Sequence, residues 1–183
     1  MDKRPDYKII EKEVLELWEK NKDLFSFDIK KDKKYIIDTP PPFTSGEAHM
    51  GHALEFVWID FLARYKRLEG YNVYFPLGFD CHGLPTELKV ISKLKINKED
   101  KEKFIKACID WTNKSIESMY NTFVRLGSSF DRNKVYKTMD EKYEAFVQYT
   151  LIKMFNEGLI ERKKYPVIWC PKCQTASSMQ EAG

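Results

Sequence analysis

The chain has 183 residues, 43% of them hydrophobic, which suffices for one domain with a smaller appendage. Its formal net charge is +3, and acidic residues are interspersed with the lysines, so the charge permits contact with nucleic acid without requiring it. No apolar run reaches the ~18 to 20 residues that span a bilayer, and the N-terminus lacks the apolar stretch of a signal peptide. We therefore expect a soluble cytoplasmic protein with no membrane partner.

The N-terminal region is expected to be helical. Residues 9–21 place apolar side chains at helical spacing among charges, which predicts an amphipathic helix that packs on the main body. The charged run Lys30–Lys34 is expected to be a solvated loop. After it, residues 34–38 form a short β-branched and aromatic run, which predicts a first strand.

The stretch Asp38–His52 joins this strand to a long helix predicted over residues 51–69. Its three prolines fix φ and remove backbone donors, so the strand must stop before them. His49 and His52 share one side of the first helical turn, and Gly51 between them leaves room for a close ligand. A helix N-terminus also presents free N–H groups and a positive dipole end. The pattern predicts a site for polyanionic phosphate.

The helix over residues 51–69 is apolar on most sides, so we expect it to be largely buried against a sheet. Residues 71–76 predict a second strand, which completes a βαβ unit with parallel strands. Because ligands bind beyond the carboxyl ends of such strands, the Pro-rich loop and the loop over residues 78–85 should meet there. Asp80 would then place a carboxylate opposite the histidines, a layout that suits a zwitterionic substrate beside a nucleotide.

Further helices and two short β-prone runs are predicted after this unit. Pro85 suits a first helical turn, and Thr138–Glu141 fits a capping box that opens the last helix. The helices are expected from Pro85 to about Leu94, from Asn97 to Gly127 and from Thr138 to Gly158, and the β-prone runs cover residues 158–162 and 165–169.

Cys170 and Cys173 form a C-x-x-C pair near the end of the sequence. Tetrahedral zinc needs four ligands, and none of the ten residues after Cys173 is Cys or His. A thioredoxin-like redox motif belongs in a different βα context, so we favour a zinc knuckle whose other ligands lie outside this chain. Cys81 and Cys108 are expected to be ordinary buried thiols.

Four stretches together resemble the class I aminoacyl-tRNA synthetases of the valine, isoleucine and leucine subgroup. His49-Met-Gly-His52 is similar to the family's H-I-G-H signature, with Met in place of Ile. Pro40–Pro42 and Gly78–Glu87 most resemble the N-terminal part of the archaeal-type valyl enzymes, and the likeness runs as far as Trp169–Cys173. The four stretches are Tyr35–Gly46, His49–His52, Ala63–Arg67 with Gly70–Val73, and Gly78–Glu87.

The resemblance implies an α/β fold: a Rossmann-like parallel sheet, the first half of a class I synthetase nucleotide fold, with added helices and the start of a zinc-binding insertion. On this basis residues 1–33 are an N-terminal helical extension, residues 34–164 a catalytic half-domain with a helical segment, and residues 165–183 the start of a zinc-knuckle and editing insertion that is truncated here.

The resemblance also implies a site for ATP and an amino acid. His49 and His52 would be catalytic residues that contact ATP phosphates, and Gly51 would let adenine lie close. Asp80 would hold the ammonium group of the amino acid. Side chains and backbone at 41–43 would border the amino-acid pocket, namely Pro41, Pro42 and Phe43.

The implied reaction joins valine to ATP as valyl-adenylate with release of pyrophosphate, and then transfers valine to tRNA. Mg²⁺ would arrive with ATP, and Zn²⁺ would occupy a half-site at Cys170 and Cys173. Catalysis of this kind rests on positioning and charge stabilisation, so no protein nucleophile is needed.

The sequence also departs from the family pattern. The second signature, K-M-S-K-S, is absent, since Lys89–Leu94 resembles it only superficially and lies in the wrong half of the fold. The chain is therefore expected to be incomplete alone: an expressed fragment, a split-gene product that a second polypeptide completes, or a stand-alone relative. Other possibilities are an isoleucyl or leucyl enzyme, another nucleotidyltransferase with H-x-G-H, and a non-catalytic nucleotide- or tRNA-binding subunit.

Overall fold

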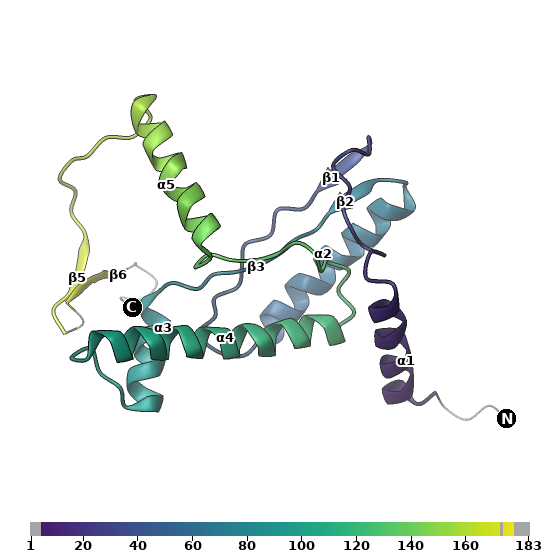
Figure 1. Cartoon of the computed structure of the whole chain (residues 1–183), viewed down its shortest axis with the longest axis horizontal. Helices are drawn as coiled ribbons and strands as arrows, with labels where there is room; N and C mark the ends of the chain where they lie inside the picture. Colours follow the sequence, from purple (N-terminus) through teal and green to yellow (C-terminus); the bar gives the residue numbers. More distant parts are fainter. Residues whose placement is uncertain (1–4, 173, 178–183) are drawn as a thin grey trace. The chain divides into compact units, whose positions relative to one another are not determined.

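The computed structural model describes residues 5–172 and 174–177, which divide into two compact units, Met1–Glu144 and Ala145–Gly183. Figure 1 shows the elements in chain order. The first unit contains α1 (Tyr7–Lys20), β1 (Lys34–Ile36), α2 (Met50–Leu68), β2 (Asn72–Tyr74), β3 (Leu77–Phe79), α3 (Leu84–Lys89), the π-helical turn η1 (Val90–Leu94), α4 (Lys101–Arg125) and β4 (Val135–Lys137). Helix α5 (Glu141–Asn156) follows, and the second unit contains β5 (Ile168–Cys170) and β6 (Thr175–Ser177).

The strands of the first unit are parallel, as the βαβ pattern predicts. β1 pairs with β2, and β3 pairs with β4. Strands β2 and β3 follow one another along a single extended segment (Figure 1). Tyr74 and Asp80 of this segment accept hydrogen bonds from the β1 side, whereas Phe75 and Phe79 accept from residues 131–138. Because backbone groups alternate in direction along a strand, β1 and β4 flank opposite edges of this central segment.

This mixed α/β fold with short parallel sheets confirms the predicted fold class. Three strands are additions to the prediction: β3, which overlaps the start of the expected loop over residues 78–85, and β4 and β6, for which no strand is predicted. Each has only three residues, too few to show a clear alternation of apolar and polar side chains.

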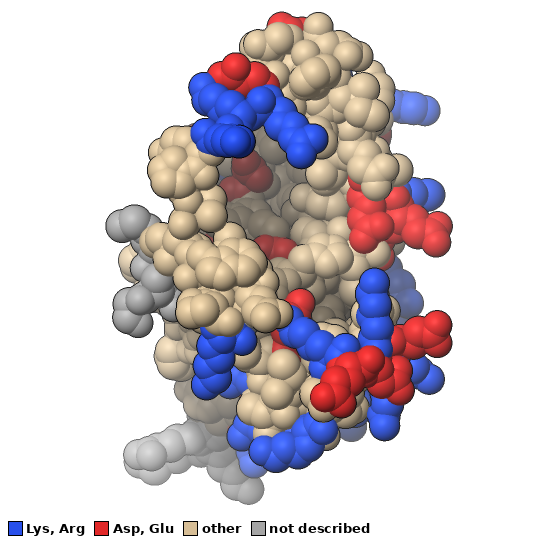
Figure 2. Space-filling view, turned by 90° about the vertical axis from the view of Figure 1, so that its left-hand side faces the viewer, with Lys and Arg blue, Asp and Glu red and all other residues tan. Residues whose placement is uncertain are grey.

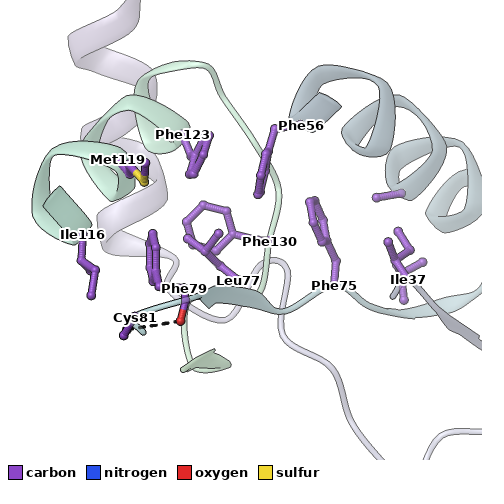
Figure 3. Packing of buried hydrophobic residues seen from close by; sticks show 12 residues of the cluster. Ile37, Phe56, Phe75, Leu77, Phe79, Cys81, Ile116, Met119, Phe123 and Phe130 are labelled. Atoms are coloured by element: carbon purple, nitrogen blue, oxygen red, sulfur yellow. Dashed lines mark hydrogen bonds between the residues drawn. The ribbon is translucent and has the colours of Figure 1, made fainter. Parts of the chain in front are cut away.

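The core of the first unit lies between the central segment and helices α2 and α4. Figure 3 shows Phe75, Leu77 and Phe79 on one face of the segment, as a period of two requires. On the helices, the rings of Phe56 and Phe123 stack with centroids 3.9 Å apart and an interplanar angle of 17°. The aromatic packing anchors the start of α2 and the end of β3 to the same body.

Helix α2 is not buried in the way that its sequence predicts. Its fully covered positions are Phe56, Asp60 and Ala63, whereas Trp58 is 65% exposed and Phe61 is 67% exposed. The expectation of a largely buried helix is therefore wrong for this chain. The reason is geometric, since two helices over one short parallel layer cover a single stripe of α2.

A charged network fixes the C-terminal half of α2 to the segment after α4. The Asp60 carboxylate accepts hydrogen bonds from the Ser129 backbone N–H at 2.6 Å and from its Oγ at 2.5 Å. Its other oxygen accepts from Arg64 Nε at 2.6 Å. Arg67 donates to the Oγ of Ser129 at 2.6 Å and to its carbonyl at 2.9 Å. Each of these side chains thus has a hydrogen-bond partner within the cluster.

The other helices follow their sequence signals. Asp6 caps α1, and Asp100 caps α4 by accepting from the Lys103 N–H at 3.1 Å. Pro85 stands in the first turn of α3, and Gly127 follows α4 with φ at +80°. In the part of the chain that the structure describes, no helix combines the length and hydropathy that would let it cross a membrane.

The region after β4 differs from its prediction in two ways. Thr138 does not form the expected capping box, because its Oγ accepts a hydrogen bond from the Cys81 N–H at 2.8 Å. Residues 158–162 form no strand, and the second β-prone run begins pairing only at Ile168. There β5 and β6 form an antiparallel hairpin in which Trp169 faces Ala176. In residues 145–172 and 174–177 no side chain is buried.

Candidate functional site

The start of α2 is closed by the two predicted histidines. His49 is the N-cap residue, and its Nδ1 accepts hydrogen bonds from the backbone N–H groups of Gly51 at 3.1 Å and His52 at 3.3 Å. In return, His52 Nδ1 accepts from the His49 N–H at 3.4 Å. The backbone N–H groups of Gly51 and His52 are therefore engaged, which corrects the expectation that a ligand would meet free amides there.

This reciprocal cap determines which ring atoms face outward as donors. A ring nitrogen that accepts a hydrogen bond carries no proton, so each neutral imidazole carries its proton on Nε2. The two rings stack with centroids 3.8 Å apart and an interplanar angle of 14°. The pKa of His52 lies below its ordinary value because burial, and then the neighbouring His49, disfavour its charged form, while Glu55 opposes this shift. The start of α2 therefore offers two adjacent Nε2–H donors.

Gly51 is needed for the cap as well as for space. A Cβ at this position would lie 2.9 Å from Cε1 and 3.0 Å from Nδ1 of His49. Such contacts are too short, so a larger residue would push the His49 ring off the helix end. Gly51 thus permits the cap in addition to the close ligand approach expected from its lack of a side chain.

A cavity of about 400 Å³ opens beside this helix start. His49 and His52 both line it, and Trp111 closes one side by donating from Nε1 to the Ser45 carbonyl at 3.2 Å. The bond joins α4 to the loop before α2. The remaining lining residues are Phe43, Gly46, Glu47, Lys89, Lys93 and Met119.

The Pro-rich loop and the end of β3 meet, as the βαβ geometry predicts. Phe43 and Asp80 form a parallel bridge, in which the Asp80 N–H donates to the Pro42 carbonyl at 2.9 Å and the Thr44 N–H donates to the Asp80 carbonyl at 3.0 Å. Thr44 adds a bond from its Oγ1 to the same carbonyl at 2.9 Å. Backbone contacts therefore hold Asp80 beside the loop that carries Pro41, Pro42 and Phe43.

Two residues of β4 and its end support the Asp80 region. The Thr138 hydroxyl lies 3.4 Å from Asp80 Oδ1 and also receives the Cys81 N–H. The Tyr136 ring packs against Gly78, where a Cβ would lie 2.3 Å from its Cζ. Burial raises the pKa of Tyr136, and nearby groups including Asp80 add to the shift, so its hydroxyl stays protonated.

The structure thus brings most predicted residues into two adjoining groups. His49 and His52 share their cavity with Phe43, and Phe43 bridges to Asp80. Asp80 itself does not line that cavity. Pro42 is buried, Pro41 is half-buried and Phe43 is 58% exposed. The roles of these residues remain predictions, now with a shared location.

Sequence reasoning missed several residues around the site. Thr138 was assigned to a helix cap, and Tyr136 lay in a stretch with no prediction. Lys89 and Lys93 belong to a stretch that matches a family signature only superficially, although their spacing of four puts them on one side of a helix. That spacing was the available signal. Trp111 gave none beyond core periodicity.

The predicted metal ligands lie in the second unit. Cys170 is the last residue of β5 and its carbonyl accepts from the Gln174 N–H at 2.8 Å, whereas Cys173 lies outside the described residues. Within residues 5–172 and 174–177, no group of three or more His, Cys, Asp or Glu side chains forms a metal site. Two thiolates alone do not fill a tetrahedral zinc site.

Comparison with known families identifies the chain. The family model described as tRNA synthetases class I (I, L, M and V) matches residues 13–182, nearly the whole sequence. The chain belongs to this family. Its membership confirms the resemblance that the H-x-G-H stretch and the Pro-rich loop suggest.

Among curated proteins, this class I synthetase chain is similar to archaeal valine–tRNA ligases. It is 49% identical over 175 residues to that of Pyrococcus furiosus, covering 93% of the chain and 20% of the relative. It is 54% identical over 149 residues to the Pyrococcus horikoshii protein, covering 81% of the chain and 17% of that relative. It is 46% identical over 185 residues to the Methanocaldococcus jannaschii protein, covering 99% of the chain and 21% of that relative. The chain thus spans about a fifth of the length of these relatives.

A solved structure gives the same fold. The chain resembles the Agrobacterium radiobacter K84 agnB2 LeuRS, determined as a ternary complex with tRNA and LeuAMS, with a TM-score of 0.75 and 27% identity. The match covers 91% of this chain and 20% of that one. The class I synthetase fold of the described residues therefore agrees with the family match.

Proposed function

We propose that this chain is the N-terminal catalytic portion of a valine–tRNA ligase, which activates valine with ATP to valyl-adenylate and transfers it to tRNA. The observation that carries the proposal is the joint position of the His49–His52 cap and the Phe43–Asp80 bridge in a chain 46–54% identical to the valine–tRNA ligases compared above. Valine is favoured over isoleucine and leucine because of these relatives.

In this proposal His49 and His52 bind ATP phosphates through their Nε2–H groups. The cap holds both rings in the required tautomer before ligand arrives, so no reorganisation is needed on binding. These donors would stabilise charge on the phosphate as the valine carboxylate attacks the α-phosphorus and pyrophosphate leaves. Gly51 lets the adenine ring approach, and Mg²⁺ enters with ATP.

Asp80 is proposed to hold the ammonium group of valine. Its carboxylate lies beside the loop whose Pro41, Pro42 and Phe43 are proposed to border the valine side chain. Thr138, at 3.4 Å from Asp80 Oδ1, helps to orient that carboxylate. The bridge therefore fixes the distance between the ammonium site and the side-chain pocket.

Other parts of the proposal concern the rest of the protein. The relatives are about five times as long, so remaining catalytic groups would come from further sequence, in the same or in a second polypeptide. Residues 1–33, 34–164 and 165–183 keep their predicted domain assignments as part of this proposal. Cys170 and Cys173 would supply two of four ligands to a structural zinc, which metal analysis of wild-type and Cys170→Ser protein would test.

Isothermal titration of the 183-residue chain with a non-hydrolysable valyl-adenylate analogue tests the proposal directly. We expect binding that is tighter for the valyl analogue than for the isoleucyl and leucyl analogues. Asp80→Asn should weaken the analogue but spare an analogue without the ammonium group. Failure of all three analogues to bind would refute a preformed adenylate site in this chain.

A further inference from the structure

The cavity beside α2 has cationic groups that the proposed function does not use. Lys89 and Lys93 line it together with His49 and His52. We propose that Lys89 and Lys93 bind the pyrophosphate end of ATP, the β- and γ-phosphates, as a second cationic wall of this cavity. This inference rests on the proposed function, since it takes ATP as the nucleotide that occupies the histidine site.

The placement of the two lysines follows from their helix. Lys89 ends α3 and Lys93 lies in η1, so a spacing of four residues puts both on one side, facing the cavity. Residues so spaced on a helix have Cβ atoms about 5–6 Å apart, so both lysine side chains can reach one ligand in the cavity. The lysines and the histidines come from different elements, so a bound polyphosphate would be held from two directions.

Both lysines are available for a ligand. Their side chains are exposed, and within residues 5–172 and 174–177 neither forms an ion pair. Lys98, just beyond the same helical segment, instead forms an ion pair with Glu87 at 2.5 Å. Lys89 and Lys93 therefore keep their charges free toward the cavity, where Lys98 is neutralised.

The charge balance of the lining favours a small polyanion. Two ammonium groups and two imidazole N–H donors face one carboxylate, that of Glu47. The rest of the wall includes the apolar side chains of Trp111 and Met119, and low polarity beside a charge strengthens its attraction for an anion. A ligand with several negative charges and a compact shape fits this lining.

The observations favour polyphosphate over the backbone of RNA. Nucleic acid is held by basic side chains along an extended stripe. Figure 2 instead shows Lys and Arg in small groups interspersed with Asp and Glu on the face it presents. Lys89 and Lys93 line a cavity of about 400 Å³, the scale of a small-molecule site.

The test compares a double variant with a matched control in the 183-residue chain. Lys89→Gln/Lys93→Gln removes both cavity charges, whereas Lys103→Gln/Lys106→Gln removes two exposed lysines of α4 that do not line the cavity. The ligands are ATP, inorganic tripolyphosphate, a short RNA hairpin and the valyl-adenylate analogue, which lacks the β- and γ-phosphates. Calorimetry at two salt concentrations measures each affinity.

We expect the cavity variant to bind ATP and tripolyphosphate about tenfold more weakly, because each lost contact is a charge-assisted bond at an exposed position. Its affinities should also depend less steeply on salt. The adenylate analogue should change by no more than about twofold, and the control variant should match wild type throughout. Lys89→Arg/Lys93→Arg, which keeps both charges, should restore most of the affinity.

Several outcomes would overturn the inference. Unchanged affinity of the cavity variant for ATP and tripolyphosphate would do so while leaving the adenylate site intact, and so would absence of tripolyphosphate binding to wild type at low salt. An effect confined to a short RNA hairpin would assign the lysines to nucleic acid instead. Lysine-dependent binding of tripolyphosphate without any binding of the adenylate analogue would support the polyphosphate site and refute the proposed function.

Discussion

The two ends of α2 use polar residues in opposite ways. In the C-terminal half, the charged groups of Asp60 and Arg67 form hydrogen bonds inside the protein. Asp60 accepts from Ser129 and Arg64, and Arg67 donates to Ser129. At the N-terminal end, His49 and His52 spend only their Nδ1 atoms on the helix and keep Nε2–H free to donate. The C-terminal half therefore holds the helix in place, and the N-terminal end keeps two hydrogen-bond donors that the helix does not use.

The polar groups at the two ends of α2 differ in the hydrogen-bonding capacity that remains after their bonds within the protein are counted. Asp60 is 8% exposed, and both of its oxygens have partners. His49 is exposed and His52 is partly buried, and the helix cap leaves the Nε2–H donor of each ring unused. Charge and helix position alone would not have made this distinction, since both ends are rich in polar residues.

The largest effect is expected at the buried end. Asp60→Ala would leave the Ser129 donors and the Arg64 Nε–H without their acceptor, so the free energy of unfolding should fall by about 3 kcal/mol. Urea denaturation followed by circular dichroism measures this loss. An exposed acid on α4, as in Glu102→Ala, is the control and should change stability by less than about 0.5 kcal/mol. Equal stability of Asp60→Ala and wild type would show that the Asp60 hydrogen bonds do not stabilise the fold.

A smaller, divided effect is expected at His49. His49→Ala loses both the cap and the outward donor, so stability should fall by about 1 kcal/mol and ATP should bind less tightly. His49→Asn supplies a good capping side chain without the Nε2–H donor, so it should keep stability and still lose ATP affinity. Thermal melts and ATP titration of the two variants separate the roles. If Asn restored ATP binding, the cap alone would matter.

The smallest effect concerns pH. The lowered pKa of His52 means that the unfolded chain takes up its proton at a higher pH than the folded one, so this stability is present above about pH 6.5 and is lost as pH falls through the folded pKa. The pKa values of Glu11 and Glu69 are lowered by hydrogen bonds from Arg125 and Lys66, so the stability that these carboxylates contribute is lost only at more acidic pH.

Melting temperatures between pH 7.5 and 5 test this linkage. We expect wild type to lose about 1–2 °C more than His52→Gln over that interval. Parallel curves for the two proteins would show that protonation of His52 does not destabilise the helix start.

Much of the fold could be predicted because its signals are local. Caps such as Asp100, the glycine after α4, and the helical spacing in α1 and α4 depend on neighbours in sequence. The βαβ unit also followed, since a parallel pair requires a long crossover. The meeting of the Pro-rich loop with Asp80 is a direct result of that topology.

The failures have a shared cause, which is that tertiary contacts decided them. Thr138 has the sequence of a helix cap, but the Cys81 N–H takes its hydroxyl instead. The exposure of Trp58 depends on how many other elements pack against α2, which the sequence of α2 alone cannot predict. The position of Lys89 and Lys93 in the same cavity as the histidines results from tertiary packing, so the sequence does not predict it.

The bridge between Phe43 and Asp80 has a consequence for how such a protein can diverge. Its bonds join backbone atoms, so they do not depend on which side chain stands at position 43. Substitutions at 41–43 can therefore change the shape of a neighbouring pocket while the carboxylate of Asp80 keeps its place. With the roles proposed above, a descendant could acquire a different amino-acid preference without first rebuilding the site for the ammonium group, which all amino acids have in common.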